Sequence, residues 1–309
     1  ATRRRPPVDF ATIAGKLYAC GGNGEDSQPL SSAERFDPVS GRWELLPPMF
    51  FSARVGGSSA VMGGKLYICG GLDSDGRAVN SAERFDPDTN MWEPLPLMFV
   101  RRHGAGCAVL DSKWYVCGGL TVDRSGERAL SSVECFDDEL GGWQRLPDMR
   151  AARWGPIVAA VSKHVYACGG FNKKRTKVLC IAERFDPANG AWEPLPHMLS
   201  RRHGGAHVVV AGRLYLFGGL AAAQRPLLAA EVFDPDDHAW QALPSLSEAR
   251  WGPAAAFLGG RIFVAGGYNA DLHALNSVEC FDLGASAWTP LPPLNMARGS
   301  VGMAILRSL

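Results

Sequence analysis

Short apolar stretches alternate with turn residues along the whole chain. Between 56 and 96, small residues at 56–62 precede an apolar run at 65–71, an alternating stretch at 80–86 and a tryptophan-bearing stretch at 90–96. The second stretch ends in two glycines and the fourth ends at proline. Strands of this length, bounded by turn residues, are typical of antiparallel sheet, and no stretch longer than ten residues has a helical period. The pattern predicts four short antiparallel strands.

The same pattern occurs six times. Glycine pairs recur every 48 to 51 residues, and a tryptophan follows each pair. The pairs begin at Gly21, Gly70, Gly118, Gly169, Gly218 and Gly266, and the tryptophans are Trp43, Trp92, Trp143, Trp192, Trp240 and Trp288. Between them lies an acidic–aromatic–acidic core such as "ERFDP" at 34–38. Six copies in register predict a repeat fold that fills nearly the whole chain.

The repeat resembles the Kelch repeat, whose period and diglycine-to-tryptophan signature mark a β-propeller. The family's aromatic residue before the diglycine is also present, as Tyr18, Tyr67, Tyr115, Tyr166, Tyr215 and Phe263. The family's second tyrosine is phenylalanine in every unit, which removes a hydroxyl group. The resemblance covers roughly residues 15–305 and implies an all-β, six-bladed propeller with four antiparallel strands per blade.

The chain is expected to form one domain. Its parts are a leader at 1–14, repeats at about 15–53, 54–101, 102–152, 153–201, 202–249 and 250–297, and a closing segment at 298–309. The C-terminal segment repeats the innermost-strand pattern, whereas the N-terminal segment 5–14 contains two prolines and an aspartate. Because proline cannot donate to a strand ladder, we expect the C-terminal strand at about 298–306 to complete the first blade and close the ring.

Columns that recur in every unit indicate scaffold. Cys20, Cys69, Cys117 and Cys168 directly precede the diglycine and are expected to be packed core, in preference to redox or metal sites. An arginine follows each tryptophan by 10 or 11 residues, and each acidic–aromatic core begins with glutamate. These are Arg54, Arg102, Arg153, Arg202, Arg250 and Arg298, with Glu34, Glu83, Glu134, Glu183, Glu231 and Glu279. Since buried carboxylates need partners, we expect a Glu–Arg pair in each blade.

The residue after the column arginine differs between the repeat units. Strand alternation turns it toward the mouth of the central channel if the arginine turns into the blade. This column is Val55, His103, Trp154, His203, Trp251 and Gly299. Thus "RRHG" at 101–104 and 201–204 alternates with "RWGP" at 153–156 and 250–253. Duplication of a two-blade unit would produce this repetition, so selection for a binding pocket is not needed to explain it.

A second variable column lies six residues before each column glutamate. It contains Gln28, Arg77, Arg128, Lys177, Arg225 and His273. The fourth loop adds Lys173, Lys174 and Arg175, whereas the first loop, at 23–28, is acidic. Solvated lysines and arginines in loops need no function individually, but as a column they indicate a binding face.

The domain also resembles the propellers of BTB-Kelch adaptor proteins, in which these two columns and the residue after the diglycine line a peptide pocket. That third set is here Asn23, Leu72, Leu120, Phe171, Leu220 and Tyr268. Pockets of this family often take acidic peptides, and we predict an acidic peptide ligand with at least one aromatic or aliphatic anchor. We expect Arg77, Arg128, Lys177 and Arg225 to meet its carboxylates, and Trp154, Trp251, Phe171 and Tyr268 to hold its apolar anchor. His273, His103 and His203 complete the predicted peptide-binding residues. Protonation of His103 and His203 would strengthen binding between pH 7.5 and 6.

Composition narrows the function classes. The 309 residues carry a net charge of +1, with no basic excess for nucleic acid and no apolar run long enough for a membrane span. The N-terminus lacks the apolar stretch of a signal peptide. Eight cysteines without a CxxC pair indicate a reduced, intracellular chain in the cytoplasm or nucleus.

Signatures of catalysis are missing from the variable columns. They hold no carboxylate pair for glycoside hydrolysis, no nucleophile beside a base and no phosphate-binding loop. A copper oxidase of this fold would need Tyr, Cys and His converging at the axis, and no cysteine accompanies His103 and His203 in their column. We therefore expect no catalytic residue, no metal and no cofactor.

The predicted function is binding of a protein segment on one propeller face. The BTB-Kelch resemblance implies substrate recognition for a cullin-based ubiquitin ligase, with the cullin contacted only through domains outside this sequence. The alternatives are an actin-associated or scaffolding Kelch protein, or a regulatory domain fused to an enzyme such as a phosphatase. A BTB or BACK domain upstream would favour the ligase, and a phosphatase domain would favour the regulatory alternative.

Overall fold

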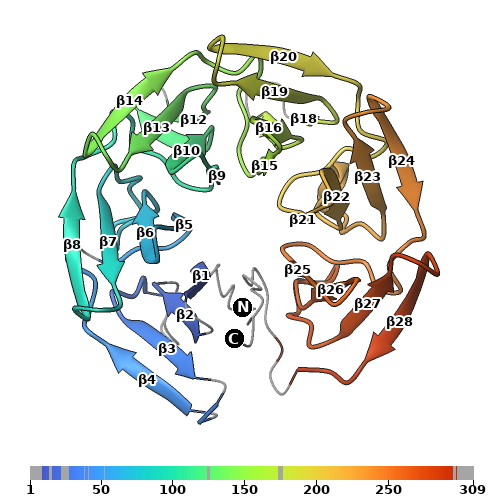
Figure 1. Ribbon diagram of the computed structural model, residues 1–309, viewed down its shortest axis with the longest axis horizontal. Coiled ribbons are helices and arrows are strands. Elements are labelled where there is room, and N and C mark those ends of the chain that lie inside the picture. Colours follow the sequence, from blue (N-terminus) through green and yellow to red (C-terminus); the bar gives the residue numbers. More distant parts are fainter. Residues whose placement is uncertain are drawn as a thin grey trace.

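Six four-stranded antiparallel sheets stand around a common centre like the blades of a propeller (Figure 1). The structure, a computed structural model, describes residues 9–13, 16–21, 28–37, 39–40, 42–51, 53–123, 126–172, 177–294 and 297. Within each blade the strands run outward from the centre in chain order (Figure 1). This arrangement confirms the predicted all-β, six-bladed propeller with four strands per blade.

Each main strand is five residues long. The first three blades contain β1 (Asp9–Ile13), β2 (Lys16–Cys20), β3 (Ala33–Asp37) and β4 (Arg42–Leu46); β5 (Ser58–Met62), β6 (Lys65–Cys69), β7 (Ala82–Asp86) and β8 (Met91–Leu95); and β9 (Gly106–Leu110), β10 (Lys113–Cys117), β13 (Val133–Asp137) and β14 (Gly142–Leu146). The last three contain β15 (Ile157–Val161), β16 (His164–Cys168), β19 (Ala182–Asp186) and β20 (Ala191–Leu195); β21 (Ala206–Val210), β22 (Arg213–Phe217), β23 (Ala230–Asp234) and β24 (Ala239–Leu243); and β25 (Ala254–Leu258), β26 (Arg261–Ala265), β27 (Val278–Asp282) and β28 (Ala287–Leu291). In the second blade, each strand falls inside the segment predicted for it.

The first blade takes its innermost strand from the N-terminal segment, so the expectation that the C-terminal strand completes this blade is wrong. β1 pairs with β2 along its whole length, from Asp9 opposite Cys20 to Ile13 opposite Lys16. The two prolines precede Asp9, so the ladder contains no proline and the objection to this segment disappears. The predicted closing segment 298–309 lies outside the described residues.

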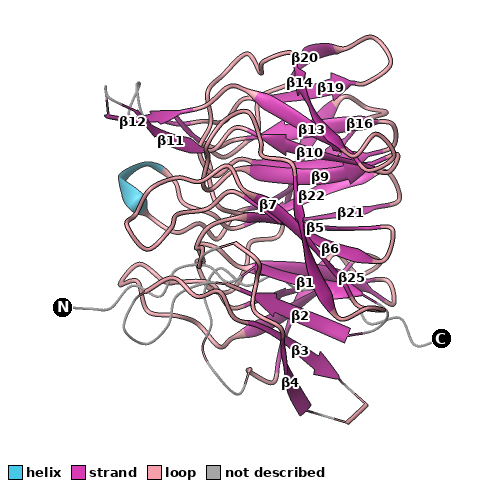
Figure 2. Cartoon of the chain, turned by 90° about the vertical axis from the view of Figure 1, so that its left-hand side faces the viewer, coloured by secondary structure: helices cyan, strands magenta, loops and turns pink. Residues whose placement is uncertain are grey.

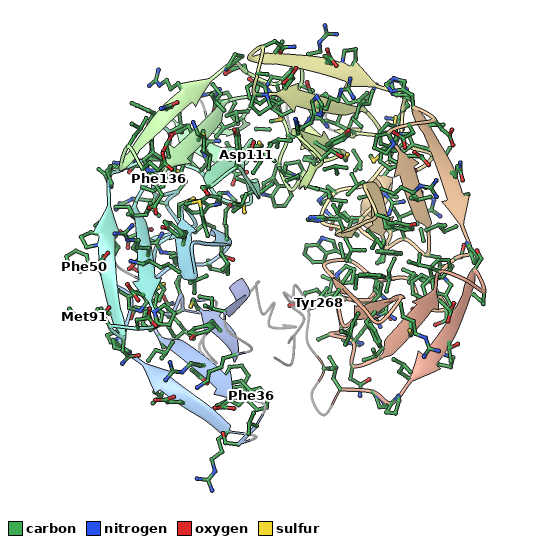
Figure 3. The ribbon with its side chains drawn as sticks, viewed as in Figure 1. Phe36, Phe50, Met91, Asp111, Phe136 and Tyr268 are labelled. Carbon is green, nitrogen blue, oxygen red and sulfur yellow. The ribbon has the colours of Figure 1, made fainter. Side chains whose placement is uncertain are left out.

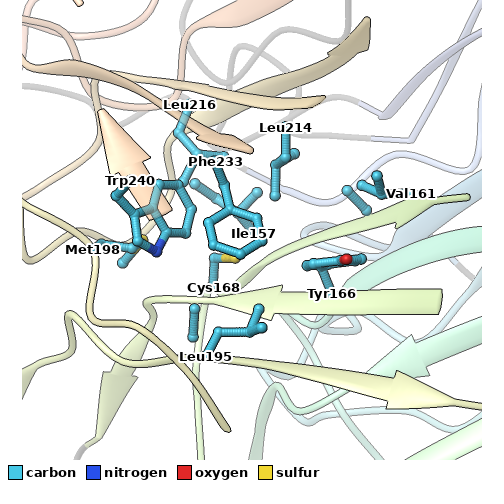
Figure 4. Packing of buried hydrophobic residues seen from close by; sticks show 12 residues of the cluster. Ile157, Val161, Tyr166, Cys168, Leu195, Met198, Leu214, Leu216, Phe233 and Trp240 are labelled. Carbon is cyan, nitrogen blue, oxygen red and sulfur yellow. The ribbon is translucent and has the colours of Figure 1, made fainter. Parts of the chain in front are cut away.

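Apolar side chains fill the spaces between neighbouring blades. The cluster between the fourth and fifth blades joins Tyr166, Cys168 and Leu195 to Leu216, Phe233 and Trp240 (Figure 4). Similar clusters join the first blade to the second, the second to the third, the third to the fourth and the fifth to the sixth. The hydrophobic core is therefore divided among the blade interfaces.

In the second to sixth blades, the tryptophan column ties the blade to the one before it. The indole N–H of Trp192 on β20 donates to the carbonyl of Pro147, just after the outer strand of the preceding blade, at 2.9 Å. Trp92, Trp143, Trp240 and Trp288 make the equivalent bond, at 2.8–2.9 Å. The proline that ends one outer strand thus accepts a hydrogen bond from the next blade.

Buried ion pairs hold the blades internally, as predicted. The pairs are Arg54–Glu83, Arg102–Glu134, Arg153–Glu183, Arg202–Glu231 and Arg250–Glu279, with N···O distances of 2.5–2.9 Å. Each arginine lies just before an innermost strand, and each glutamate lies on the third strand of the same blade. The sixth arginine of the column, Arg298, lies outside the described residues.

In the first five blades, the first glycine of the pair permits close contact with the next blade. Gly118 has a φ of +68°, and a Cβ atom there would lie 2.5 Å from the carbonyl oxygen of Arg153. The next residue, Gly119, donates its N–H to the same carbonyl at 2.8 Å. A side chain on Gly118 would therefore be both strained and obstructed.

The loops after the diglycines enlarge one face of the ring. The third blade adds the hairpin β11 (Leu120–Asp123) and β12 (Gly126–Ala129), and the fourth adds β17 (Phe171–Asn172) and β18 (Lys177–Val178). The fifth blade adds a 3₁₀ turn, η2 (Ala222–Gln224). β11, β12 and the 3₁₀ turn project from the same side of the molecule (Figure 2). In the described part of the chain, no helix is long and apolar enough to cross a membrane.

Candidate functional site

Two of the predicted site columns pair directly with each other. The backbone N–H of Trp154 donates to the carbonyl of Phe171 at 2.9 Å, and the backbone N–H of Phe171 donates to the carbonyl of Trp154 at 2.7 Å. The equivalent bridges are Val55 with Leu72, His103 with Leu120, His203 with Leu220 and Trp251 with Tyr268. In the second to sixth blades, the residue after the column arginine therefore lies beside the residue after the diglycine. Asn23 and Gly299, which continue these columns, lie outside the described residues.

Aromatic rings from three blades meet at the channel mouth. The ring centroid of Trp154 lies 6.4 Å from that of His103, 5.4 Å from that of His203 and 6.3 Å from that of Phe171. Phe171 and His203 are themselves 5.9 Å apart. Four of the predicted site residues are thus brought into one cluster.

The sixth blade carries a second aromatic pair. The rings of Trp251 and Tyr268 lie 5.4 Å apart at an interplanar angle of 35°. Tyr268 lies at the inner edge of the ring of blades (Figure 3). Val55 and Leu72 occupy the same positions in the second blade, so the mouth is aromatic along the third to sixth blades and aliphatic in the second.

A chain of backbone hydrogen bonds runs around the mouth, directly beside these side chains. Its members are Gly104 N–H to Gly56 carbonyl, Gly155 to Gly104, Gly204 to Gly155 and Gly252 to Gly204, at 2.9–3.0 Å. We call this series the backbone belt. All five glycines have φ between +57° and +66°. The belt connects the second to the sixth blade without using any side chain.

The basic column occupies one register position in every described loop. Arg128 lies opposite Thr121 in the third blade, and Lys177 lies opposite Asn172 in the fourth. In the other three loops, the residue two positions after the diglycine donates its N–H to the carbonyl of the column residue; these residues are Arg77, Arg225 and His273. All five column side chains are exposed. Lys173, Lys174 and Arg175 lie outside the described residues.

Neighbouring groups alter the charge of two predicted contacts. Arg77 forms an exposed ion pair with Asp75 at 2.7 Å, which partly neutralises it before any ligand arrives. Burial lowers the pKa of His203 to about 4. His203 therefore stays neutral between pH 7.5 and 6, and the expectation that its protonation strengthens binding in this range is wrong.

A separate hollow lies in the fourth blade, and no residue of the aromatic cluster lines it. It has a volume of about 190 Å³, and its lining includes Arg150, Leu195 and His197. The buried Arg153–Glu183 pair also contributes to its wall. Because Arg153 is engaged by Glu183 and by the carbonyls of Gly169 and Ile181, it belongs to the scaffold.

The cysteine column is buried in the scaffold, as predicted. Cys20, Cys69, Cys117 and Cys168 are each at most 1% exposed. Burial raises the pKa of Cys69 and Cys117, and it raises that of Cys168 to about 12. Among the residues that the structure describes, no three His, Cys, Asp or Glu side chains gather as a metal site would require.

Sequence reasoning identified the columns but missed the spatial relations between blades. It placed His103 and His203 two blades apart and gave them no common neighbour, whereas Trp154 contacts both rings. It also assigned no role to the glycine in "RRHG". The signal was present in the strict His-Gly and Trp-Gly alternation, but interpreting it requires the side-chain orientation of the tryptophans.

Comparison with known proteins agrees with the fold. Residues 8–198 match the family model described as the KLHDC2/KLHL20/DRC7 Kelch-repeats domain, and residues 201–247 and 249–295 each match the Kelch motif. The solved structure of YjhT superposes with a TM-score of 0.76 at 16% identity, covering 94% of this chain and 99% of that one.

Similarity to curated proteins is local. Kelch-like protein 3 of Mus musculus and of Rattus norvegicus are each 39% identical over 51 residues, or 16% of this chain. The matched region spans only 9% of the length of these relatives. The family itself is shown by the model that spans 8–198 and by the two motifs that follow it: the chain belongs to the Kelch-repeat family of β-propellers.

Proposed function

We propose that this propeller binds an acidic segment of a partner protein on the face that carries the post-diglycine loops. The Kelch propeller is a protein-interaction fold. The observation that carries the proposal is the pairing of the two variable columns across each blade, as in Trp154 with Phe171, beside an exposed basic column. Large aromatic and arginine side chains dominate the binding energy of protein interfaces, and both gather here.

The two kinds of side chain have separate roles in this proposal. Exposed charges such as Lys177 steer an acidic ligand and raise its association rate. The half-buried Trp154 offers apolar area beside His203 and Phe171, and contact with it slows dissociation. The acidic residues of the ligand would meet the loops, and its apolar anchor would meet the aromatic cluster.

We further propose that the bound segment belongs to a substrate of a cullin-RING ubiquitin ligase. The similarity to BTB-Kelch adaptors and the local match to Kelch-like protein 3 support this role. The cullin would be contacted by domains outside the 309 residues, and the propeller would act in the cytoplasm or nucleus as a non-enzymatic module. An actin-associated, scaffolding or enzyme-regulating Kelch protein would use the same face on a different partner.

Binding kinetics on a partner captured with the 309-residue chain test the proposal. Trp154→Ala should speed dissociation and weaken binding by about 2 kcal/mol, or about 30-fold. Lys177→Glu should slow association and reduce its dependence on salt. Lys163→Glu is the matched control, since it makes the same charge change in the same blade, in the turn between β15 and β16 at the opposite face.

The opposite result would overturn the choice of face. Wild-type kinetics for Trp154→Ala and Lys177→Glu, with binding lost in Lys163→Glu, would place the site on the other side of the ring. The ligase role is tested separately in the full-length protein. There Trp154→Ala should abolish ubiquitin conjugation of the partner, and unchanged conjugation would contradict substrate recognition through this face.

A further inference from the structure

Two tryptophans at the channel mouth lie over glycines of the preceding blade. A Cβ atom placed on Gly104 would overlap Nε1 of Trp154 and lie 2.8 Å from its Cδ1. A Cβ atom placed on Gly204 would lie 2.6 Å from Nε1 of Trp251 and 3.1 Å from its Cδ1. The nearest three indole atoms are the same, in the same order, at both sites. The two indoles therefore adopt equivalent positions two blades apart.

Two other glycines of the backbone belt, Gly155 and Gly56, lack this cover. A Cβ atom on Gly155 would meet nothing closer than 3.6 Å, and one on Gly56 would meet nothing within 4 Å. Yet Gly155 has the same conformation as Gly104, with φ of +59° against +57°, and both donate and accept in the belt. The hydrogen bonds of the belt alone therefore do not explain why Gly104 and Gly204 lie beneath an indole.

Each covered glycine belongs to a larger duplicated unit. The first unit, which we call the first shelf, consists of Gly104 with Trp154 and its bridge partner Phe171. The second shelf consists of Gly204 with Trp251 and its bridge partner Tyr268. The repeated "RRHG" and "RWGP" segments supply the glycine and the tryptophan of each shelf.

Basic side chains accompany both shelves. The first shelf lies in the third and fourth blades, whose loops carry the exposed Arg128 and Lys177. The second shelf lies in the fifth and sixth blades, whose loops carry the exposed Arg225 and His273. Both tryptophans are only half-buried, so each shelf keeps part of an indole open to a ligand.

We propose that the face holds two like anchors at once, so that its partner segment carries two flat apolar side chains, each beside an acidic residue. Flat groups such as aromatic or proline rings suit this surface because they stack on an indole without entering a deep pocket. The inference rests on the proposed function and specifies its ligand as bipartite. Gly104 and Gly204 are positioning residues in it, because they leave room for the indoles.

The experiment uses two synthetic probes and two reporters. The single probe is acetyl-Asp-Phe-Glu-amide, and the tandem probe joins two such units by a flexible Gly-Ser linker. Because the chain has nine tryptophans, 5-fluorotryptophan is placed singly at position 154 or 251 and followed by ¹⁹F NMR. The single probe should shift both signals with affinities within about threefold of each other. The tandem probe should shift both at concentrations at least about tenfold lower, since its second contact is intramolecular.

Glycine substitutions then separate the shelves. Gly104→Ala should abolish the response at position 154 and preserve that at 251, and Gly204→Ala should do the reverse. Gly155→Ala is the matched control because it imposes the same backbone strain without an indole above it. It should preserve both responses, and thermal unfolding of all three variants confirms that the strain is comparable.

Several outcomes overturn the proposal. They are a response to the probe at one position only, no response at either, equal affinities for the single and tandem probes, or equal effects of Gly104→Ala and Gly155→Ala. The captured partner distinguishes this failure from failure of the proposed function. A partner that shifts only one reporter signal would support the proposed binding face but contradict the second anchor. A partner that binds but shifts neither reporter signal would contradict both proposals.

Discussion

The buried arginine of the fourth blade is bound on several sides at once. Arg153 contacts the Glu183 carboxylate through two nitrogens, at 2.6 and 3.2 Å, and donates to two backbone carbonyls. Glu183 also accepts the backbone N–H of Arg150, in the connection that enters the blade. Loss of one partner would leave a buried charge uncompensated, which costs more than the pair itself contributes.

Arg153→Ala should lower the free energy of unfolding by about 3–5 kcal/mol, measured by denaturant titration. Arg184→Ala in the same blade is the control, because its partner Glu193 is 45% exposed and such pairs contribute about 1 kcal/mol or less. Equal losses in the two variants would contradict the assignment of Arg153 to the scaffold. Lost binding with unchanged stability would move Arg153 into the site.

His203 links the channel mouth to stability against acid. Its pKa is about 4 in the folded chain because it is buried, against about 6.5 in an unfolded one. The folded state therefore binds fewer protons than the unfolded state between these values, so stability falls as pH drops from about 6.5 to about 4. For His203 the loss approaches about 3 kcal/mol at the lower end. Burial also lowers the pKa of His207 on β21 to about 4, so both histidines act in the same direction.

His203→Gln should make the free energy of unfolding less dependent on pH between about 6.5 and 4, measured by urea titration at several pH values. His273→Gln, at an exposed position, should reproduce the wild-type dependence. Parallel curves for wild type and His203→Gln would show that His203 titrates normally in the folded chain.

At the scale of the element, the second strand of each blade shows how far the sequence specifies structure. In β6 and β16, all residues after the first are buried, and the strand ends at a cysteine just before the diglycine. A short apolar run that ends in two glycines was sufficient to locate these strands, because each unit repeats the same local pattern. The hairpins β11–β12 and β17–β18 were not foreseen, because loops that differ in length carry no repeat from which to predict pairing.

The cysteines test this strand register. Cys69, Cys117 and Cys168 should resist a thiol reagent in the native chain, because they are buried and burial raises their pKa. Cys180, half-buried in the loop before β19, is the internal control and should react first. Peptide mapping after timed alkylation measures the order. Rapid labelling of the first three without unfolding would contradict the register.

At the scale of the molecule, the ring and its columns could be predicted, but contacts between blades could not. Strand alternation turned Trp154 toward the channel mouth, the family resemblance assigned Phe171 to the same pocket, and the structure pairs the two. The source of the first blade's innermost strand was misjudged, because prolines at its approach were counted as part of it. The burial of His203 depends on rings from two blades, and no periodicity within one unit encodes that.

The backbone belt has a consequence for how such a surface diversifies. Its hydrogen bonds from Gly56 to Gly252 use only backbone atoms, so they set the spacing of the blades independently of the neighbouring side chains. Residues at the positions of Val55, His103 and His203 are then free to change chemically while the diameter of the opening stays constant. Beneath Trp154 and Trp251, by contrast, the belt glycines Gly104 and Gly204 are also assigned to recognition. The propeller architecture can therefore stay the same while the binding specificity of the face changes, except at these two places.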